Sequence, residues 1–284
     1  MKFHQKPVSY VSDIHLYVSD LTRSIAFYES VIGFKVMKES EQRATLTADG
    51  KTPLVTIEQP NEVTPRNQHN TGLFHFALLL PTRADLAKAL IHLVKSQYPL
   101  QGASDHLVSE ALYLADPDGN GIEIYADRPD ETWNWHNGEV EMATIALDAQ
   151  GLVDEDDGTP WQGLPPATVM GHIHLQVSEL ENTYEFYCKG LGLDLVTKYG
   201  NQALFISSGA YHHHIGLNTW VSQGGEKPVE TSVGLKWYTL VLPSDDDLSK
   251  TISLLKEVNA PVNDKDGYIQ TEDPSGNVIH LVVK

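Results

Sequence analysis

The chain has 284 residues and carries 20 Lys and Arg against 38 Asp and Glu, which gives a formal net charge of −18. Its hydrophobic fraction of 41% is typical of folded chains, and its length suits about two domains. The acidity excludes nucleic-acid and membrane-surface binding, and the single Cys188 excludes a disulfide-stapled fold. No segment has the character of a signal peptide or a membrane span, so we expect a cytoplasmic protein.

The first quarter of the chain predicts a βαβββ unit. We expect a strand near Ser12–Val18 and then a helix that has Ser19 or Asp20 as its N-cap and ends at Gly33. Three short strands are expected next, at Phe34–Glu39, Arg43–Ala48 and Pro53–Gln59. These elements form a module that the rest of the chain repeats.

The second quarter follows the same order. A strand is expected at Leu73–Leu80, and a helix at Arg83–Ser96 has its apolar residues in one stripe. Further strands are expected around Leu100, at Leu112–Ala115 and at Ile122–Ala126. Modules three and four begin at His172 and Lys236 and follow the same pattern.

Two long sequence matches show that the chain is an internal duplication. The segment IHLYVSDLTRSIAFYESVIGFKVM from Ile14 reappears as IHLQVSELENTYEFYCKGLGLDLV from Ile173. The segment DPDGNGIEIY from Asp116 reappears as DPSGNVIHLV from Asp273, in the same order. Such a repeat determines how the whole chain should be divided.

We therefore predict an α+β fold of four βαβββ modules, paired within each half into two curved, partly closed sheets with helices outside. The first half is expected at residues 1–127 and holds the metal site. A linker is expected at residues 128–169, and the second half at residues 170–284. The second half is expected to have a degenerate metal site.

Three polar side chains interrupt apolar strands of the first half, namely His15, His75 and Glu123. Strand side chains alternate between the two faces of a sheet, so we expect these three to meet in its concavity. Two histidines and one carboxylate suit a divalent metal with open positions, and non-haem Fe(II) is the leading example. The alternatives are a hydrogen-bonded core histidine at position 15 and a sheet-edge carboxylate at position 123.

With these modules and side chains, the chain resembles the vicinal-oxygen-chelate superfamily, which contains glyoxalase I, extradiol dioxygenases and bleomycin-resistance proteins. The resemblance covers nearly the whole chain, and it implies metal ligands at His15, His75 and Glu123. The chain is similar to two-domain bacterial catechol 2,3-dioxygenases. In that group the second half carries the metal, whereas here the first half holds the ligand set.

The segment SDHLVSEALYLADPDGNGIE, which ends at Glu123, is similar to the signature of the extradiol enzymes. This resemblance implies that His106 is an acid–base residue and that Tyr113 hydrogen-bonds a substrate oxygen. The alternatives are a solvated loop histidine and a core tyrosine. Ser104 departs from the small residue that the signature has before its histidine.

The function implied by this resemblance is Fe(II)-dependent ring opening of a small aromatic diol with O₂. Mn(II), Ni(II) and Zn(II) are alternative metals, and no organic cofactor is expected. Nucleic acid and membrane are not expected as partners. Strand edges of such modules often pair between chains, so a homo-oligomer remains an open expectation.

Two other functions remain open. Glu58 ends the last strand of module one, where the resemblance places a fourth ligand of glyoxalase I, and a His/Glu/His/Glu set suits Ni or Zn. The alternative for Glu58 is an exposed strand end. A non-catalytic protein that binds a drug or metabolite in the same concavity is the other open function, although such relatives typically lack the ligand triad.

The second half carries a different set of side chains at the matching positions. His174 corresponds to His15 in the repeat, but Trp237 is at the position that corresponds to His75, and His280 is at the position that corresponds to Glu123. The segment AYHHHIGLN is expected to place three histidines on a strand of this half. One of them, such as His214, would complete a second metal set with His174 and His280; the alternative is solvated imidazoles.

Overall fold

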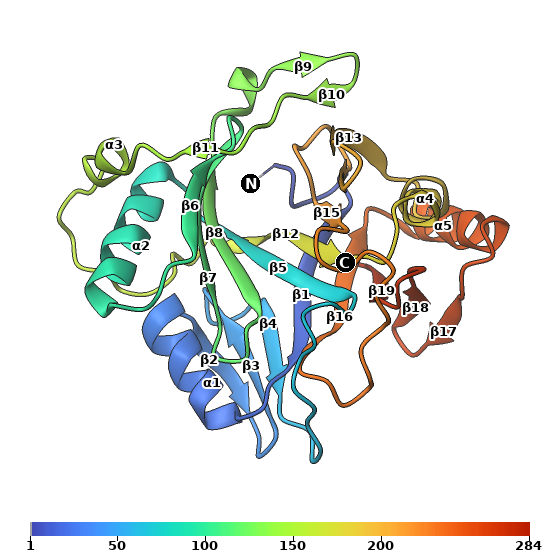
Figure 1. The fold of residues 1–284 in the computed structure, drawn as a ribbon, viewed down its shortest axis with the longest axis horizontal. Coiled ribbons are helices and arrows are strands. Elements are labelled where there is room, and N and C mark those ends of the chain that lie inside the picture. Colours follow the sequence, from blue (N-terminus) through green and yellow to red (C-terminus); the bar gives the residue numbers. More distant parts are fainter. Residues whose placement is uncertain (1) are drawn as a thin grey trace.

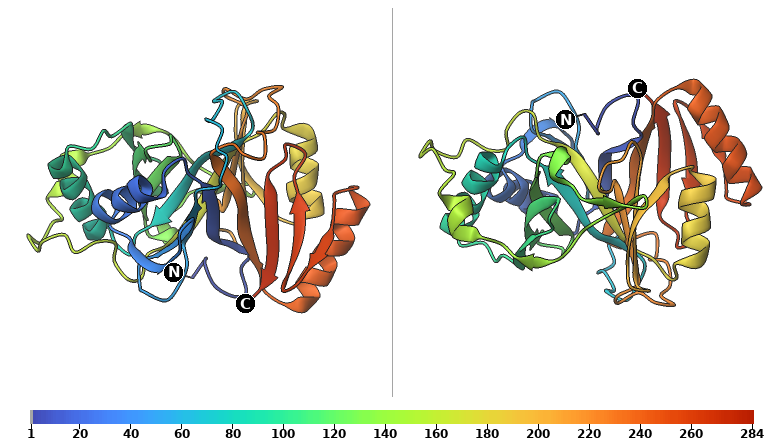
Figure 2. Two further views of the ribbon diagram at one scale, coloured as in Figure 1. Left: turned by 90° about the horizontal axis from the view of Figure 1, so that it is seen from below. Right: turned by 90° about the horizontal axis from the view of Figure 1, so that it is seen from above.

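The computed structural model describes residues 2–284, which form two curved sheets with helices on their outer sides (Figure 1, Figure 2). Each of the four repeats contributes one long first strand and three shorter strands. Within residues 2–284, no helix has both the length and the apolar character needed to cross a lipid bilayer.

Module one has the predicted order, and both predicted helix ends are confirmed. The Asp20 carboxylate accepts a hydrogen bond from the backbone N–H of Arg23, and Gly33 has a φ of 90° that ends the last turn. Its elements are β1 (Tyr10–Tyr17), α1 (Leu21–Phe27), a π-helical turn (Tyr28–Ile32), β2 (Lys35–Glu39), β3 (Arg43–Thr47) and β4 (Val55–Glu58).

Module two also matches its predicted order, and its helix has the predicted bounds. The buried side chains of this helix include Leu86, Leu90 and Leu93, which form the apolar stripe. Its elements are β5 (Gly72–Leu79), α2 (Arg83–Ser96), β6 (Gly102–Asp105), β7 (Ser109–Ala115) and β8 (Gly121–Asp127).

The segment between the halves is ordered and joins a sheet. Its last strand pairs with β6 and becomes the edge of the sheet that contains module two. Its elements are a 3₁₀ turn (Asp130–Thr132), β9 (Trp135–His136), β10 (Glu139–Val140), β11 (Ile145–Ala146) and α3 (Ala149–Val153).

Modules three and four repeat the pattern. Module three consists of β12 (Val169–Gln176), α4 (Glu181–Tyr184), a π-helical turn (Glu185–Gly190), β13 (Asp194–Tyr199), β14 (Ala203–Ser207) and β15 (Ile215–Asn218). Module four consists of β16 (Gly234–Leu242), α5 (Asp245–Glu257), β17 (Asn263–Lys265), β18 (Tyr268–Glu272) and β19 (Val278–Val283).

The modules pair across the two halves, and not within them. One sheet has the strand order β17-β18-β19-β16-β1-β4-β3-β2 and joins modules one and four. The other has the order β11-β6-β7-β8-β5-β12-β15-β14-β13 and joins modules two and three. The prediction of pairing within each half is wrong, because the first strands of all modules share one hydrophobic pattern that does not select a partner.

The α+β class, the four modules and the two curved sheets are confirmed. The boundaries at residues 1–127, 128–169 and 170–284 stay predictions. Neither half closes a sheet by itself, whereas the helices do keep to their own halves: α2 contacts the π-helical turn of module one, and α5 contacts that of module three. Figure 2 shows these two helical groups at opposite sides of the molecule.

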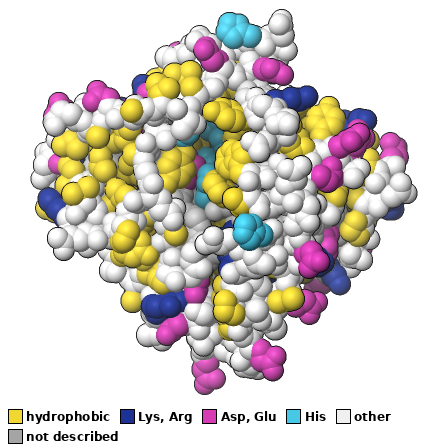
Figure 3. Space-filling view, in the orientation of Figure 1, with side chains coloured by type: hydrophobic (Ala, Val, Ile, Leu, Met, Phe, Trp, Pro, Cys, Tyr) yellow, Lys and Arg dark blue, Asp and Glu magenta, His cyan; other side chains and the backbone are white. Residues whose placement is uncertain are grey.

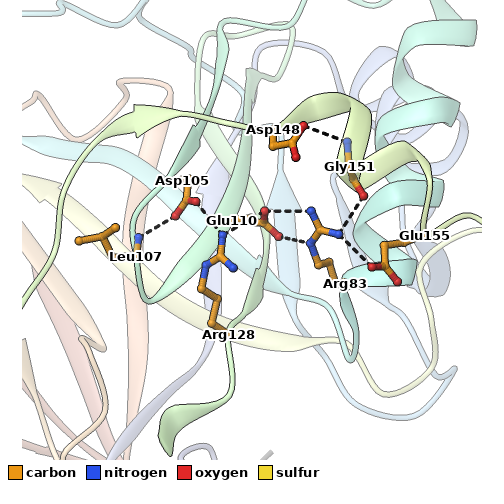
Figure 4. A network of polar contacts seen from close by, with 8 residues as sticks. All are labelled: Arg83, Asp105, Leu107, Glu110, Arg128, Asp148, Gly151 and Glu155. Carbon is orange, nitrogen blue, oxygen red and sulfur yellow. Dashed lines mark hydrogen bonds and ion pairs between the residues drawn. The ribbon is translucent and has the colours of Figure 1, made fainter. Parts of the chain in front are cut away.

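A polar network fastens the linker to module two (Figure 4). The buried Glu110 carboxylate accepts from Arg83 Nε at 2.6 Å and from an Arg128 nitrogen at 3.2 Å. Arg83 also donates to the carbonyl of Gly151 in α3 at 2.9 Å, and Arg128 donates to Asp105 at 2.6 Å. One carboxylate thus connects α2, β7, the end of β8 and the linker helix.

We predict that Glu110→Gln lowers the free energy of unfolding by about 1–3 kcal/mol, because two guanidinium groups lose their shared buried anion. Urea denaturation measures this loss. As a matched control, Glu185→Gln removes an exposed pair with Lys189 and should cost less than about 0.5 kcal/mol. Equal effects of the two substitutions would contradict the assigned role of Glu110.

Candidate active site

Three ligand-type side chains meet in the sheet that modules two and three share. They are His75 on β5, Glu123 on β8 and His172 on β12. The Nε2 atoms of His75 and His172 lie 3.0 and 3.1 Å from Glu123 Oε2. All three side chains are buried. Among residues 2–284 this is the one group of three that offers a metal-sized arrangement.

The strand pairing explains this convergence. β5 is the central strand of the three: it pairs in parallel with β8 and antiparallel with β12. β12 has a register irregularity between Met170 and His172, and bulges of this kind re-aim side chains. Gly121 permits the close approach of β8, since a Cβ at this position would lie 2.2 Å from the carbonyl oxygen of Phe74.

The three side chains fit a divalent metal. Neighbouring ligands of an octahedral ion lie about 3 Å apart when the bonds are about 2.1 Å long, which matches the separations here. The contact of His75 Nε2 with Glu123 lacks hydrogen-bond geometry, so this buried nitrogen has no hydrogen-bond partner within residues 2–284. A buried nitrogen without a partner is costly, and a metal ion would satisfy it.

The charges of the cluster also suit ligation. Burial opposes the charge of Glu123, but His172 and His75 outweigh it and hold the pKa of the carboxyl well below its usual range. Burial lowers the pKa of His172, and Glu123 only partly offsets this shift. The cluster therefore combines an ionised carboxylate with a neutral imidazole, the protonation states that metal binding needs.

A cavity of about 380 Å³ lies over the cluster, and its walls are mainly apolar. Figure 3 shows histidine side chains at the bottom of a hollow that hydrophobic side chains border. Phe74, Phe205 and Trp220 contribute aromatic walls, and Met142 of the linker covers one side. Such a cavity is able to hold a small aromatic molecule against the cluster and to limit the entry of water.

His106 and Tyr113 face this cavity together. The Tyr113 hydroxyl lies 2.6 Å from His106 Nε2, and His106 Nδ1 lies 2.7 Å from the carbonyl oxygen of Ala143. Burial and the nearby Glu123 carboxylate raise the pKa of Tyr113 well above its usual value, so the phenol stays protonated. The linker, through Ala143, therefore holds His106 in place.

His15 does not join His75 and Glu123. It lies on β1 in the other sheet, where its Nε2 is 3.0 Å from Glu58 Oε2 and its ring stacks on Trp237 at 3.8 Å. Its prediction as a ligand is corrected for this reason: pairing across the halves separates module one from module two. Glu58 also binds Arg43, so the structure does not bring it to the cluster as a fourth ligand.

The second predicted metal set does not assemble. His280 stacks on Trp237 at 4.8 Å in the sheet of modules one and four, whereas His174 lies in the other sheet. Both ring nitrogens of His214 have partners: Phe3 O at 2.9 Å, and the hydroxyl of Ser207 at 3.1 Å. The three consecutive histidines lie in the loop before β15 and not on a strand.

Sequence reasoning missed His172 as a member of the cluster and His213 as a cavity residue. His172 lies two residues before His174, and the alternation of strand side chains places both on one face. The repeat aligns His174 with His15 and His172 with Asp13. Only His174 was therefore predicted as a ligand in this strand. His213 was identifiable only as one of three adjacent histidines.

Comparison with known proteins shows the family of the chain. The model of the Glyoxalase/Bleomycin resistance protein/Dioxygenase superfamily matches residues 10–124 and 169–281. The chain belongs to this superfamily. Both matched regions correspond to the two halves of the duplication.

Two enzymes illustrate the similarity within the superfamily. The chain is 43% identical over 272 residues to "Catechol-2,3-dioxygenase" of Bacillus subtilis (strain 168), covering 94% of this chain and 95% of that protein. It is 29% identical to "Biphenyl-2,3-diol 1,2-dioxygenase 3" of Rhodococcus globerulus, over 44% of this chain and 68% of that protein. These relatives confirm the expectation of a dioxygenase-type enzyme.

Solved structures support the fold. Glyoxalase I from Zea mays superposes with a TM-score of 0.60 at 16% identity, over 97% of this chain and 92% of that chain. The cppA protein from Streptococcus pneumoniae TIGR4 gives a TM-score of 0.57 at 10% identity, over 98% of this chain and 100% of that chain. At these identities the likeness concerns the fold alone.

We predict that His75→Ala and His172→Ala each weaken the binding of a divalent metal by about 100-fold or more, because each removes one of three ligands. His15→Ala serves as the matched control and should retain the metal. Elemental analysis after desalting provides the measurement. Loss of metal from His15→Ala, with retention in His172→Ala, would move the site to the other sheet.

A pH dependence of stability follows from His15. Burial lowers its pKa to about 4, although Glu58 partly offsets the shift. Between about pH 6.5 and pH 4, His15 is therefore protonated in the unfolded chain and largely neutral in the folded chain. In this range His15 reduces stability as the pH falls, by up to about 1.4 kcal/mol per pH unit.

His15→Phe keeps an aromatic ring against Trp237 and removes the titrating group, so stability should fall less steeply between pH 6.5 and pH 4. Urea denaturation across this range tests the expectation. His136→Phe, at an exposed position, is the control for the substitution itself. Parallel slopes for wild type and His15→Phe would contradict the assignment.

Proposed function

We propose that this chain is an extradiol ring-cleaving dioxygenase that opens a catechol-type diol with O₂, using Fe(II) held by His75, Glu123 and His172. One observation carries the proposal: a buried two-histidine, one-carboxylate cluster lies beneath a largely apolar cavity. This set leaves metal positions open, as non-haem Fe(II) oxygenases require. The 43% identity to a catechol-2,3-dioxygenase over nearly the full length supports the diol as substrate.

The cluster and the cavity have separate tasks. When bound, Fe(II) would supply the Lewis acidity and the redox capacity that allow a diol to react with O₂. Phe74, Phe205 and Trp220 provide apolar surfaces on which a planar ring packs, and they exclude water from the reacting atoms.

His106 and Tyr113 form a path for a proton on the cavity side. The carbonyl of Ala143 only accepts, so His106 Nδ1 carries hydrogen and Nε2 accepts from the Tyr113 hydroxyl. The Tyr113 oxygen keeps lone pairs for a substrate hydroxyl. A proton released by the diol would then reach His106 Nε2 through Tyr113, which is general base catalysis by a positioned pair.

The glyoxalase I-like alternative depended on Glu58 as a fourth ligand. Glu58 lies on β4 in the other sheet and binds His15 and Arg43. In module one, Glu58 pairs with Tyr17 of the first strand. The residue at the corresponding position of module three is Asn218, which pairs with Gln176, so module three has an amide in place of this carboxylate. Glu58 therefore does not serve as a fourth ligand at the cluster, and the argument for a glyoxalase I-like function does not hold there.

We predict that protein loaded anaerobically with Fe(II) converts catechol and O₂ into a yellow ring-opened semialdehyde, which absorbance follows directly. Both atoms of O₂ enter the product, so oxygen uptake should equal product formed. His172→Ala should abolish the colour, and His15→Ala should retain it. Binding of catechol without ring opening by the iron-loaded protein would favour the non-catalytic alternative and contradict this proposal.

A further inference from the structure

Three side chains form a hydrogen-bonded chain that starts near the surface and ends at the cavity. Asp127 Oδ1 lies 2.8 Å from His212 Nε2, and His212 Nδ1 lies 2.8 Å from His213 Nδ1. Asp127 is the last residue of β8, and the two histidines belong to the loop between β14 and β15. The hydrogen-bonded chain therefore runs from module two to module three.

The direction of these hydrogen bonds follows from the carboxylate at one end. A carboxylate only accepts, so His212 Nε2 carries hydrogen. When this is the only hydrogen on the ring nitrogens, His212 Nδ1 is an acceptor and His213 Nδ1 donates to it. His213 Nε2 is left as an acceptor, so one carboxylate determines the tautomer of two successive histidines.

His213 presents this acceptor at the cavity. It is one of the cavity-lining residues, and its ring lies 4.1 Å from the ring of His172 and 5.0 Å from Phe205, between centroids. Within residues 2–284, no hydrogen bond engages His213 Nε2. His106 differs, because the protein occupies both of its ring nitrogens.

The carboxylate at the start of the chain is held firmly. Asp127 Oδ1 also accepts from the hydroxyl of Tyr211 at 3.2 Å, and Tyr211 is 2.7 Å from the hydroxyl of Tyr125. The side chain of Asp127 is 22% exposed, whereas that of His212 is fully buried. Trp133 packs edge-on against the His212 ring at 5.1 Å. These contacts restrict both side chains to one orientation.

We infer that Asp127, acting through His212, is a positioning residue that holds His213 with Nε2 as a hydrogen-bond acceptor facing the metal cavity. The inference rests on the proposed function for its consequence: a substrate hydroxyl above the cluster donates to this nitrogen. Neither Asp127 nor His212 lines the cavity. Their contribution is the tautomer and the orientation of His213.

The test is Asp127→Asn, which keeps the shape and reverses the polarity. The substitution replaces one of the two acceptor oxygens by an NH₂ donor; where this NH₂ faces His212 Nε2, His212 Nδ1 becomes the donor and His213 Nε2 carries the hydrogen. In metal-free protein labelled with ¹⁵N-histidine, NMR distinguishes the two tautomers of His213, and His213→Gln assigns its signals. We expect the Nδ1–H tautomer in wild type and the Nε2–H tautomer in Asp127→Asn. Because the asparagine oxygen is also able to accept from His212, Asp127→Leu is measured beside it, and an unchanged tautomer of His213 in both variants overturns the inference.

The activity of iron-loaded protein provides the second measurement. In Asp127→Asn, kcat for ring opening should fall about tenfold or more with iron content retained, because a wrong tautomer presents a donor where an acceptor is needed. KM for catechol should change less than about threefold, since ring packing is untouched. Glu131→Gln, an exposed carboxylate nearby, is the control and should match wild type.

His212→Leu interrupts the same chain by another route and should lower kcat similarly, which keeps the test decisive if one variant fails to fold. Full activity in both folded variants overturns the inference. Absence of ring opening in iron-loaded wild type overturns the proposed function instead, and the NMR measurement still decides the inference by itself.

Discussion

The antiparallel pairing of β5 with β12 is the interaction on which the candidate site depends. It joins the last module of the first half to the first module of the second half, with His75 opposite His174 and His172 two residues further along. Glu123 reaches the same place because β8 is the other neighbour of β5. Each of the three cluster residues thus lies on a central strand of a nine-stranded sheet, with a paired strand on both sides.

The sequence predicted the modules well because each one depends on local chemistry. The Asp20 cap, the Gly33 end and the apolar stripe of α2 are determined within a few residues of chain. Partner choice among the four first strands is a non-local property that repeated sequences leave undetermined. His15 was consequently assigned to the wrong sheet, while His75, Glu123, His106 and Tyr113 were brought together because they belong to one module.

The sheet of modules one and four has aromatic rings at the positions that correspond to the cluster. His15, Trp237, His280 and Tyr268 form a continuous stack of rings with successive centroids 3.8, 4.8 and 4.1 Å apart. Trp237 occupies the place in its module that corresponds to His75, so aromatic packing stands here where the sheet of modules two and three has the histidine–carboxylate cluster. Stacking of this kind stabilises a concave sheet without an ion.

The exchange of strands between the halves also has a consequence for synthesis. A ribosome completes residues 1–127 before the second half exists, and at that stage β1 and β5 lack the partners β16 and β12. The nascent first half therefore exposes an unpaired edge on each of these two long strands, a surface prone to association with other chains. The cluster of His75, Glu123 and His172 becomes complete only when β12 has emerged, so the third module must be translated before this site can form.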